Sequence, residues 1–234
     1  MIREAILLAG GLGTRLRSAV PDLPKCMAPV AGRPFLAHLI DHCLRQGVES
    51  FIFSLGYKHE TILRFLADEY PSLEAKNFIE KQPLGTGGAV KAACALVQGD
   101  QVLIMNGDTL FDADLAALCR FHMDKRSACT LALKPMKDSD RYGVVEMDDQ
   151  GRIQQFREKN WYAESLINGG VYALDKEEFL SRPLPHKFSF EKDYLEKYSS
   201  SRRFFGFVQD KYFIDIGVPE DFQKAQIELP LQHD

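Results

Sequence analysis

An apolar run near the start of the chain ends abruptly at a glycine-rich loop. The run covers residues 6–9, and the loop contains Gly10, Gly11, Gly13, Thr14, Arg15 and Arg17. Glycines let backbone N–H groups approach a ligand closely, and neighbouring arginines suit phosphate. The pattern predicts a buried strand that delivers a phosphate-binding loop to its carboxyl end. The alternative is a tight turn whose arginines are merely solvated.

The spacing of these glycines excludes the two commonest phosphate-binding motifs. A dinucleotide fingerprint that starts at Gly11 and Gly13 needs a third glycine where this chain has Leu16. A P-loop closes on Gly-Lys-Ser or Gly-Lys-Thr, and neither tripeptide occurs in the sequence. An NAD-dependent oxidoreductase is further disfavoured because no ribose-binding carboxylate follows the second predicted strand.

Composition and charge narrow the class of protein. The 234 residues are 45% hydrophobic and carry a formal net charge of −4. These values predict one globular domain with a substantial core, and they disfavour a nucleic-acid-binding surface. The first apolar run is too short for a signal sequence, and no apolar run approaches the roughly 20 residues of a membrane span. We therefore predict a cytoplasmic protein with no membrane partner.

The cysteines do not form a metal or disulfide framework. Their number is odd, and no Cys-x-x-Cys pair occurs among Cys26, Cys43, Cys94, Cys119 and Cys129. Three of them, Cys43, Cys94 and Cys119, fall within predicted helices, where a small buried thiol is the expected role. The six histidines show no ligand spacing, and no Ser/His/Asp nucleophile pattern is present, so covalent hydrolase chemistry is disfavoured.

Short apolar strands alternate with amphipathic helices in the first half of the chain. Strands are predicted at residues 6–9, 51–55, 77–80 and 101–105, with helices at 35–44, 62–70 and 89–96. This order predicts a parallel sheet with right-handed crossovers. The loops at residues 10–17, 80–88 and 106–108 should then gather at the carboxyl ends of the strands, where ligands bind in such sheets.

Strands dominate the second half, with a hairpin turn at residues 148–151. They are predicted at residues 127–133, 142–147, 153–157, 166–173 and 212–214, with helices near 190–198 and after Pro219. We therefore expect a more antiparallel arrangement beyond about residue 125 within one mixed domain.

Two aspartates and three cations are candidates for chemistry. Asp108 and Asp215 each follow an apolar strand, so both carboxylates could converge on a divalent cation beside phosphate oxygens. Lys25, Arg15 and Lys159 could neutralise phosphate charge. Taken alone, an aspartate in such a position is more often a turn cap or a solvated loop residue, and a lysine or arginine is more often a solvated surface residue.

Taken together, the motifs resemble the sugar-1-phosphate nucleotidyltransferases. The pieces that match, in family order, are residues 8–16 with Pro24 and Lys25, then 83–89, 106–108, 142–143, 158–159, 168–170 and 215–217. The resemblance extends from residue 6 to residue 222. It implies an α/β protein with a Rossmann-like three-layer α/β/α nucleotidyltransferase fold and a mixed, mainly parallel central sheet. A single domain would cover residues 1–234, with a nucleotide-binding half (1–125) and a sugar-phosphate-binding half (126–234).

The resemblance also implies a role for each matched residue. Arg15, Lys25 and Asp108 would be catalytic, and Mg²⁺ would be held by Asp108 and Asp215. The sugar phosphate would contact Gly143, Glu158, Lys159, Asn168 and Asp215. The nucleotide would contact Leu8, Gly10, Gly11, Gly13, Thr14, Arg15, Gln82, Pro83, Gly87 and Asn106. The implied reaction is attack of a sugar 1-phosphate oxygen on the α-phosphorus of a nucleoside triphosphate, with release of pyrophosphate.

Four further segments resemble one subfamily, the guanylyltransferases for D-glycero-α-D-manno-heptose 1-phosphate. They are residues 140–143, 166–170, 187–191 and 212–221. This subfamily would use GTP and supply GDP-heptose for bacterial surface glycans. Mannose 1-phosphate guanylyltransferases and glucose 1-phosphate thymidylyl- or cytidylyltransferases share most of these motifs and stay open as alternatives. The resemblance also leaves a homodimer open beside a monomer.

A catalytically silent subunit that senses nucleotide sugars is the alternative from another class. Such a protein would be expected to have lost Lys25, Asp108 or Asp215, and all three are present. The sequence therefore favours an active enzyme.

Overall fold

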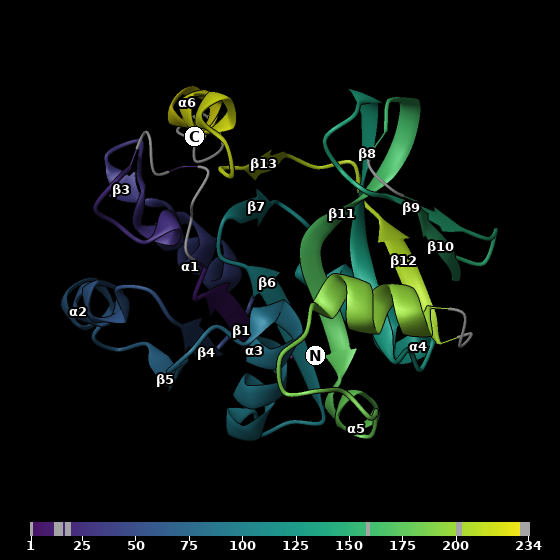
Figure 1. Cartoon of the computed structure of the whole chain (residues 1–234), viewed down its shortest axis with the longest axis horizontal. Helices are drawn as coiled ribbons and strands as arrows, with labels where there is room; N and C mark the ends of the chain where they lie inside the picture. Colours follow the sequence, from purple (N-terminus) through teal and green to yellow (C-terminus); the bar gives the residue numbers. More distant parts are fainter. Residues whose placement is uncertain (1, 12–15, 17–19, 158–159, 200–202, 230–234) are drawn as a thin grey trace.

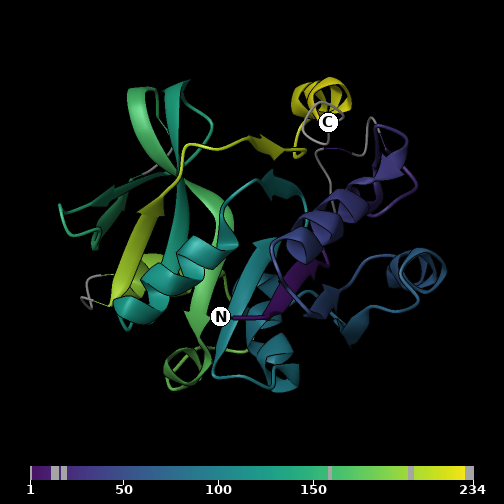
Figure 2. The same cartoon turned by 180° about the vertical axis from the view of Figure 1, so that it is seen from behind.

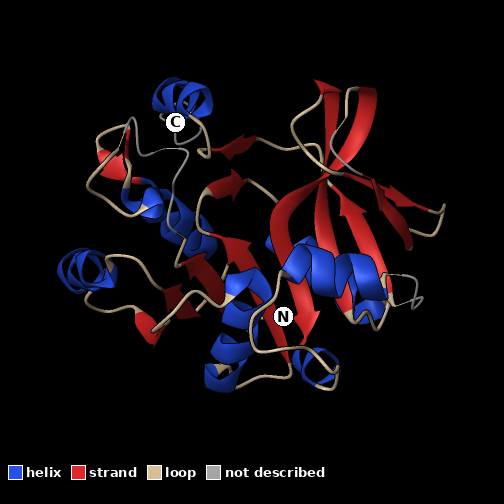
Figure 3. Cartoon of the chain, viewed as in Figure 1, coloured by secondary structure: helices blue, strands red, loops and turns tan. Residues whose placement is uncertain are grey.

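A single mixed β-sheet organises the computed structural model, which describes residues 2–11, 16, 20–157, 160–199 and 203–229 (Figure 1). Seven of its strands lie in the order β10-β9-β11-β6-β1-β4-β5, and β8 joins through β11 and β12 through β8. Helices cover both faces of this sheet, as the colouring by secondary structure shows (Figure 3). The predicted three-layer α/β/α fold with a mixed central sheet is confirmed.

The first half of the chain supplies the parallel strands. They are β1 (Glu4–Ala9), β4 (Ser50–Leu55), β5 (Glu74–Ile79) and β6 (Gln101–Asn106). β1 lies between β4 and β6 and pairs in parallel with both. The loops that follow these strands therefore meet at one edge of the sheet, as predicted.

The second half supplies antiparallel strands on the other side of β6. They are β8 (Cys129–Ser139), β9 (Val144–Met147), β10 (Ile153–Arg157) and β11 (Tyr162–Asp175). β11 pairs antiparallel with β6, β8 and β9, so one long strand connects the two halves of the sheet. β12 (Phe204–Val208) pairs with β8 in parallel and was absent from our sequence-based assignment.

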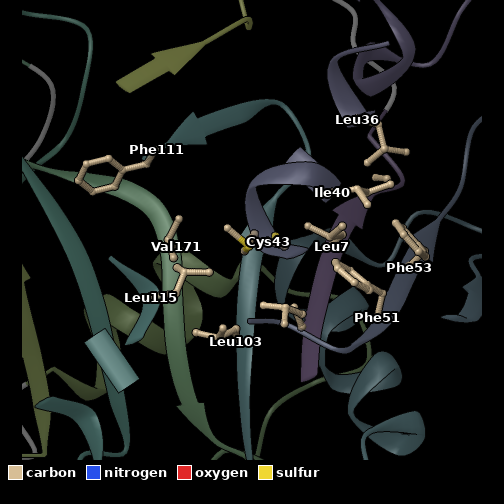
Figure 4. Packing of buried hydrophobic residues seen from close by; sticks show 14 of the residues in the cluster. Leu7, Leu36, Ile40, Cys43, Phe51, Phe53, Leu103, Phe111, Leu115 and Val171 are labelled. Atoms are coloured by element: carbon tan, nitrogen blue, oxygen red, sulfur yellow. Dashed lines mark hydrogen bonds between the residues drawn. The ribbon is translucent and has the colours of Figure 1, made fainter. Parts of the chain in front are cut away.

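Alternating side chains along β1 explain why both faces of the sheet are buried. Leu7 packs with Phe51 and Phe53 in one hydrophobic cluster, part of which is drawn in Figure 4. Ile6 points to the opposite face and packs in a second cluster with Tyr172. Successive side chains of a strand point to opposite faces, so a continuous apolar run requires helices on both sides.

The helices divide between these two clusters. α1 (Phe35–Arg45), α2 (His59–Glu69) and α4 (Leu115–Asp124) bury apolar side chains in the first cluster. Figure 2 shows α1 and α4 on the face turned toward the viewer. α3 (Gly85–Ala93), the single turn α5 (Lys176–Leu180) and the π-helical segment η3 (Phe190–Glu196) bury theirs in the second.

α4 is the helix in which the sequence analysis placed Cys119 without giving its bounds. Its N-cap is Asp114, whose side chain accepts a hydrogen bond from the backbone N–H of Ala117 at 2.8 Å. Leu115 and Leu118 are buried against the sheet. The N-cap and the three-residue spacing of the leucines were readable in the sequence, and both favour a helix.

Short elements complete the rim of the sheet. β7 (Thr109–Phe111) pairs with β13 (Phe213–Asp215), and β2 (Pro29–Val30) pairs with β3 (Arg33–Pro34). The 3₁₀ turns are η1 (Lys25–Met27) and η2 (Cys94–Leu96). α6 (Pro219–Glu228) packs beside α1 through a third cluster that contains Phe35 and Ala225. No helix in the described part of the chain is long and apolar enough to cross a membrane.

Candidate active site

A cavity of about 300 Å³ lies beyond the carboxyl ends of the parallel strands. Seven residues predicted to bind nucleotide or to act in catalysis line it: Leu8, Gly10, Gly11, Lys25, Pro83, Asn106 and Asp108. They come from the carboxyl ends of β1 and β6, from the loops after β1, β5 and β6, and from η1. The topology therefore brings these predicted residues together, and the roles assigned to them stay predictions.

Two close backbone contacts fix the floor of this cavity. The N–H of Gly107 donates to the carbonyl of Leu8 at 3.0 Å, and a Cβ at Gly107 would lie 2.5 Å from that oxygen. On the other side, a Cβ at Gly56 would lie 2.7 Å from the carbonyl oxygen of Gly10. Side chains at these glycines would push the strand ends apart, so glycine holds the loops close enough to form one site.

Lys25 lies between the two candidate metal ligands. Its Nζ forms an ion pair with Asp108 Oδ2 and lies 3.6 Å from Asp215 Oδ1. Pro24 holds extended backbone as the N-cap of η1, which presents Lys25 to the cavity. We refer to Lys25, Asp108 and Asp215 as the reaction cluster.

Pairing at the rim brings together two aspartates that are far apart in the sequence. β13 pairs with β7 so that Asp215 lies opposite Thr109, and the N–H of Ile216 donates to the carbonyl of Asp108 at 3.0 Å. The N–H of Gly217 donates to Asp215 Oδ1 at 2.7 Å, which orients that carboxylate. The convergence expected from two separate strands is therefore present.

The donor set of this cluster suits a hard divalent cation that is shared with substrate. In the described part of the chain, no group of three or more His, Cys, Asp or Glu side chains could hold a metal ion. Two carboxylates are nevertheless enough for Mg²⁺, which keeps several waters and commonly takes one or two carboxylates plus substrate phosphates. The chemistry of Asp108 and Asp215 fits this pattern, and the Lys25 ammonium lies within ion-pair distance of both carboxylates.

Glu80 is a cavity residue for which the sequence analysis assigned no role. It follows β5, and its Oε2 accepts a hydrogen bond from the backbone N–H of Leu84 at 2.9 Å. Burial raises the pKa of this carboxyl above its ordinary value, and the bond from Leu84 opposes that shift. A Cβ at Gly10 would lie 2.5 Å from Oε1, so the carboxylate rests directly against the first glycine loop.

The second glycine loop is packed rather than open. A Cβ at Gly87 would lie 2.2 Å from the Phe188 ring, and Gly85 has a positive φ of +74° and contacts the Phe188 backbone. Gln82 is exposed. Pro83, Gly85, Thr86 and Ala89 of this segment line the cavity, and among the described residues neither Gln82 nor Gly87 is part of its wall.

Among the residues predicted to contact the sugar phosphate, Asn168 is held inside a bulge of β11. Its Nδ2 donates to the Tyr172 hydroxyl at 2.8 Å, and its Oδ1 accepts from the N–H of Gly170 at 3.0 Å. The register of β11 against β8 shifts between Asn168 and Tyr172, and Gly170 has a positive φ of +72°. The side chain is thus fixed by the strand, which suits a residue that positions a ligand.

Gly143 immediately precedes β9. A Cβ atom on Gly143 would lie 3.4 Å from the carbonyl oxygen of Arg157.

Five residues with predicted roles lie outside the described part of the chain: Gly13, Thr14, Arg15, Glu158 and Lys159. Their roles stay predictions.

A second cavity, of about 220 Å³, adjoins Asp215 and is lined by Arg141, Tyr142, Phe213 and Asp221. The Arg141 guanidinium binds both carboxylate oxygens of Asp221, at 3.1 and 2.5 Å. Burial and the nearby Asp215 carboxylate raise the pKa of the Tyr142 hydroxyl to about 12, so it stays protonated at neutral pH. Arg141 and Asp221 lie in segments that carried the subfamily resemblance, but neither had an assigned role.

The chain is similar to known nucleotidyltransferases over nearly its whole length. A family model described as nucleotidyl transferase matches residues 4–230. The chain is 48% identical over 226 residues to the D-glycero-alpha-D-manno-heptose 1-phosphate guanylyltransferase of Aneurinibacillus thermoaerophilus, covering 97% of this chain and 98% of that protein. It is 44% identical over 219 residues to the Campylobacter jejuni subsp. jejuni protein of the same name, covering 94% and 96%.

A solved structure has the same fold across nearly the whole chain. The crystal structure of HddC from Yersinia pseudotuberculosis complexed with GMP-PN matches with a TM-score of 0.88 at 37% identity. The match covers 97% of this chain and 100% of that one.

Proposed function

The chain belongs to the nucleotidyl transferase family, and from that premise we propose that it transfers GMP from GTP to D-glycero-α-D-manno-heptose 1-phosphate. The products would be GDP-heptose and pyrophosphate. The observation that carries the proposal is the reaction cluster at the edge of a cavity lined by two glycine loops. The identity of 48% to a heptose 1-phosphate guanylyltransferase supports the choice of substrates.

The positions of the charged groups support an in-line displacement without a covalent enzyme intermediate. A phosphate oxygen of the sugar 1-phosphate forms a bond to the α-phosphorus of GTP, and the bond from that phosphorus to the bridging oxygen breaks as pyrophosphate leaves. Lys25 lies where it can neutralise the negative charge that develops on the α-phosphate. Positioning and charge neutralisation are the main catalytic contributions in such transfers.

Asp108 and Asp215 would hold Mg²⁺ together with oxygens of the bound substrates. The cation would supply further neutralisation of the phosphates at the point where the two substrates meet. Lys25 would then be released from its ion pair with Asp108 to face phosphate. We further propose that the reaction takes place in the cytoplasm, where GTP is available, and a homodimer stays a prediction.

Glu80 supports GTP over the other nucleotides. An ionised carboxylate only accepts hydrogen bonds, and guanine presents two neighbouring donors, N1–H and the N2 amino group, on one edge. Adenine and cytosine pair a donor with an acceptor on the corresponding edge, and uracil places one N–H between two carbonyls. A half-buried carboxylate in this cavity therefore fits guanine best.

The first test is a matrix of substrates read by pyrophosphate release. GTP, CTP, UTP, dTTP and ATP are each combined with heptose, mannose and glucose 1-phosphates. We expect the highest kcat/KM for GTP with the heptose 1-phosphate. A mannose 1-phosphate guanylyltransferase would instead prefer mannose 1-phosphate, and absence of turnover with every pair would favour a silent nucleotide-sugar sensor.

The second test is Glu80→Gln, with Glu74→Gln as the matched control. Glu74 is an exposed carboxylate at the start of β5, the strand that Glu80 follows, and it does not line the cavity. Because a hydrogen bond to a charged group contributes about 1.5–3 kcal/mol, we expect KM for GTP to rise about 10- to 100-fold in the Glu80 variant. The preference for GTP over UTP should fall with it. An unchanged preference would remove Glu80 from base recognition.

The pH dependence of KM for GTP tests the proposed role of Glu80 independently of the substitution. The carboxyl pKa is raised in the folded protein, so Glu80 takes up a proton as the pH falls through that raised value. The protonated form loses one acceptor for guanine, and KM for GTP should rise on the acid side. The Glu80→Gln variant should lose this part of the pH profile.

A further inference from the structure

A bidentate ion pair ties the β8–β9 connection to the start of α6. Arg141 lies in that connection, and Asp221 lies in the first turn of α6. Arg141 Nη1 donates to Asp221 Oδ1 and Nη2 donates to Oδ2, and the Asp221 side chain is only 16% exposed. Paired, planar bonds of this kind fix geometry better than a single contact between a lysine and a carboxylate.

The Arg141 side of this pair continues directly into the predicted sugar-phosphate site. The guanidinium lies 5.8 Å from the centre of the Tyr142 ring, and Gly143 is the next residue along the chain. The Tyr142 ring packs edge-on against Phe213 with centroids 5.7 Å apart. Phe213 lies two positions before Asp215 in β13, so the contact reaches the reaction cluster.

The Asp221 side is anchored on the first half of the chain. A short turn at residues 216–218 separates Asp215 from α6, and Ala225 of α6 packs with Phe35 of α1. The Gln226 side chain donates to the Pro29 carbonyl at 2.7 Å and accepts from the Ala31 N–H at 2.9 Å. A movement of α6 would therefore move Asp215 relative to the nucleotide cavity.

From these contacts we propose that Arg141 and Asp221 are positioning residues for the sugar 1-phosphate. Their ion pair sets the distance between the Tyr142–Gly143 segment and Asp215. This inference rests on the proposed function, because it assigns the pair to the sugar-phosphate substrate of that same site. Neither residue would touch the reacting atoms, and the pair would act through Tyr142 and Phe213.

The test measures KM for both substrates in Asp221→Asn, Arg141→Gln and Arg141→Lys. Asp221→Asn keeps the shape of the side chain and removes its charge, and Arg141→Lys keeps the charge and removes the planar pairing. Because small misplacements of a bound substrate have large effects, we expect KM for the sugar 1-phosphate to rise about 10-fold in Asp221→Asn and Arg141→Gln. KM for GTP should stay within about twofold. Arg141→Lys should recover part of the loss.

Arg3→Gln is the matched control, since it removes an exposed arginine that pairs with Glu49 far from both cavities. It should leave both KM values unchanged. The melting temperature of every variant is measured in parallel, so that a general loss of packing is recognised.

Three outcomes would overturn the proposal. If Arg141→Gln raises the sugar 1-phosphate KM and Asp221→Asn does not, Arg141 binds the sugar phosphate directly. If both KM values rise together with a lower melting temperature, the pair only stabilises the fold. If neither KM changes, it is an ordinary surface ion pair. The wild-type substrate matrix separates these results from a failure of the proposed function, because the variants are assayed with the sugar 1-phosphate that the wild type uses.

Discussion

The proposed nucleotide side of the site lies along the ends of parallel strands, whereas the proposed sugar side is assembled from a strand connection, a bulge and the start of a helix. On the first side, β1, β5 and β6 deliver their loops to one edge because parallel strands all end there. On the second side, Gly143, Asn168 and Asp221 come from β8–β9, β11 and α6. Specific side-chain contacts must therefore hold the sugar side together, while backbone topology already holds the nucleotide side.

The reaction cluster lies where the two sides meet, so we expect substitutions in it to have the largest effect on turnover. We expect Asp108→Asn and Asp215→Asn each to lower kcat by about 10³ or more, because each would remove a ligand of the bound cation. The measurement is pyrophosphate release at saturating substrates with Mg²⁺, with circular dichroism to check the fold. A large loss in Asp108→Asn with nearly normal turnover in Asp215→Asn would place the metal on the nucleotide side alone.

Lys25 belongs to the nucleotide side and should affect chemistry more than binding. We expect Lys25→Ala to lower kcat about 100-fold, with a smaller rise in KM for GTP, because charge on the α-phosphate develops mainly in the transition state. Lys76→Ala serves as the control, since it removes a half-buried lysine whose partner is the Leu96 carbonyl, away from the cavity. A rise in KM at unchanged kcat would make Lys25 a binding residue only.

The smallest expected effect concerns the packing of the second glycine loop. We expect Gly87→Ala to lower the free energy of unfolding by about 1–3 kcal/mol, because its Cβ would overlap the buried Phe188 ring. Denaturant unfolding measures the change. The double variant with Phe188→Leu should recover part of the loss, which a double-mutant cycle would detect. Full stability in Gly87→Ala would show that the loop tolerates movement and is less rigid than its packing indicates.

The same comparison explains which features were predictable from the sequence. The parallel strands were predictable because each is a short apolar run bounded by glycine or polar residues, and topology then fixes where Asp108 must lie. Asp215 was predictable because it also follows an apolar strand. The parallel sheet followed from the alternation of strands and helices in the first half, and the fold class was implied by the resemblance to the sugar-1-phosphate nucleotidyltransferases.

The contacts on the sugar side were not predictable in this way. Arg141 and Asp221 are ordinary surface residue types, 80 positions apart, and nothing in the local pattern pairs them. β12 was missed although its Phe204 and Phe205 are buried, because it pairs in parallel with β8, a strand that lies far from it in the sequence. Glu80 was missed as a site residue because its burial arises only when the β1 and β5 loops meet. The local sequence pattern predicts helices and strands. Contacts between loops that are distant in the sequence can be seen only once the sheet is assembled.

The double pairing of β11 has a consequence for how the chain folds during synthesis. β6 can pair with β1 as soon as both have left the ribosome, but its other edge waits for Val171, which pairs with Met105 across a long intervening stretch. Until then that edge presents unpaired N–H and C=O groups, which are a template for association with other chains. Closing so long a loop also slows folding. The newly made first half of this protein is therefore the species that most needs protection by chaperones.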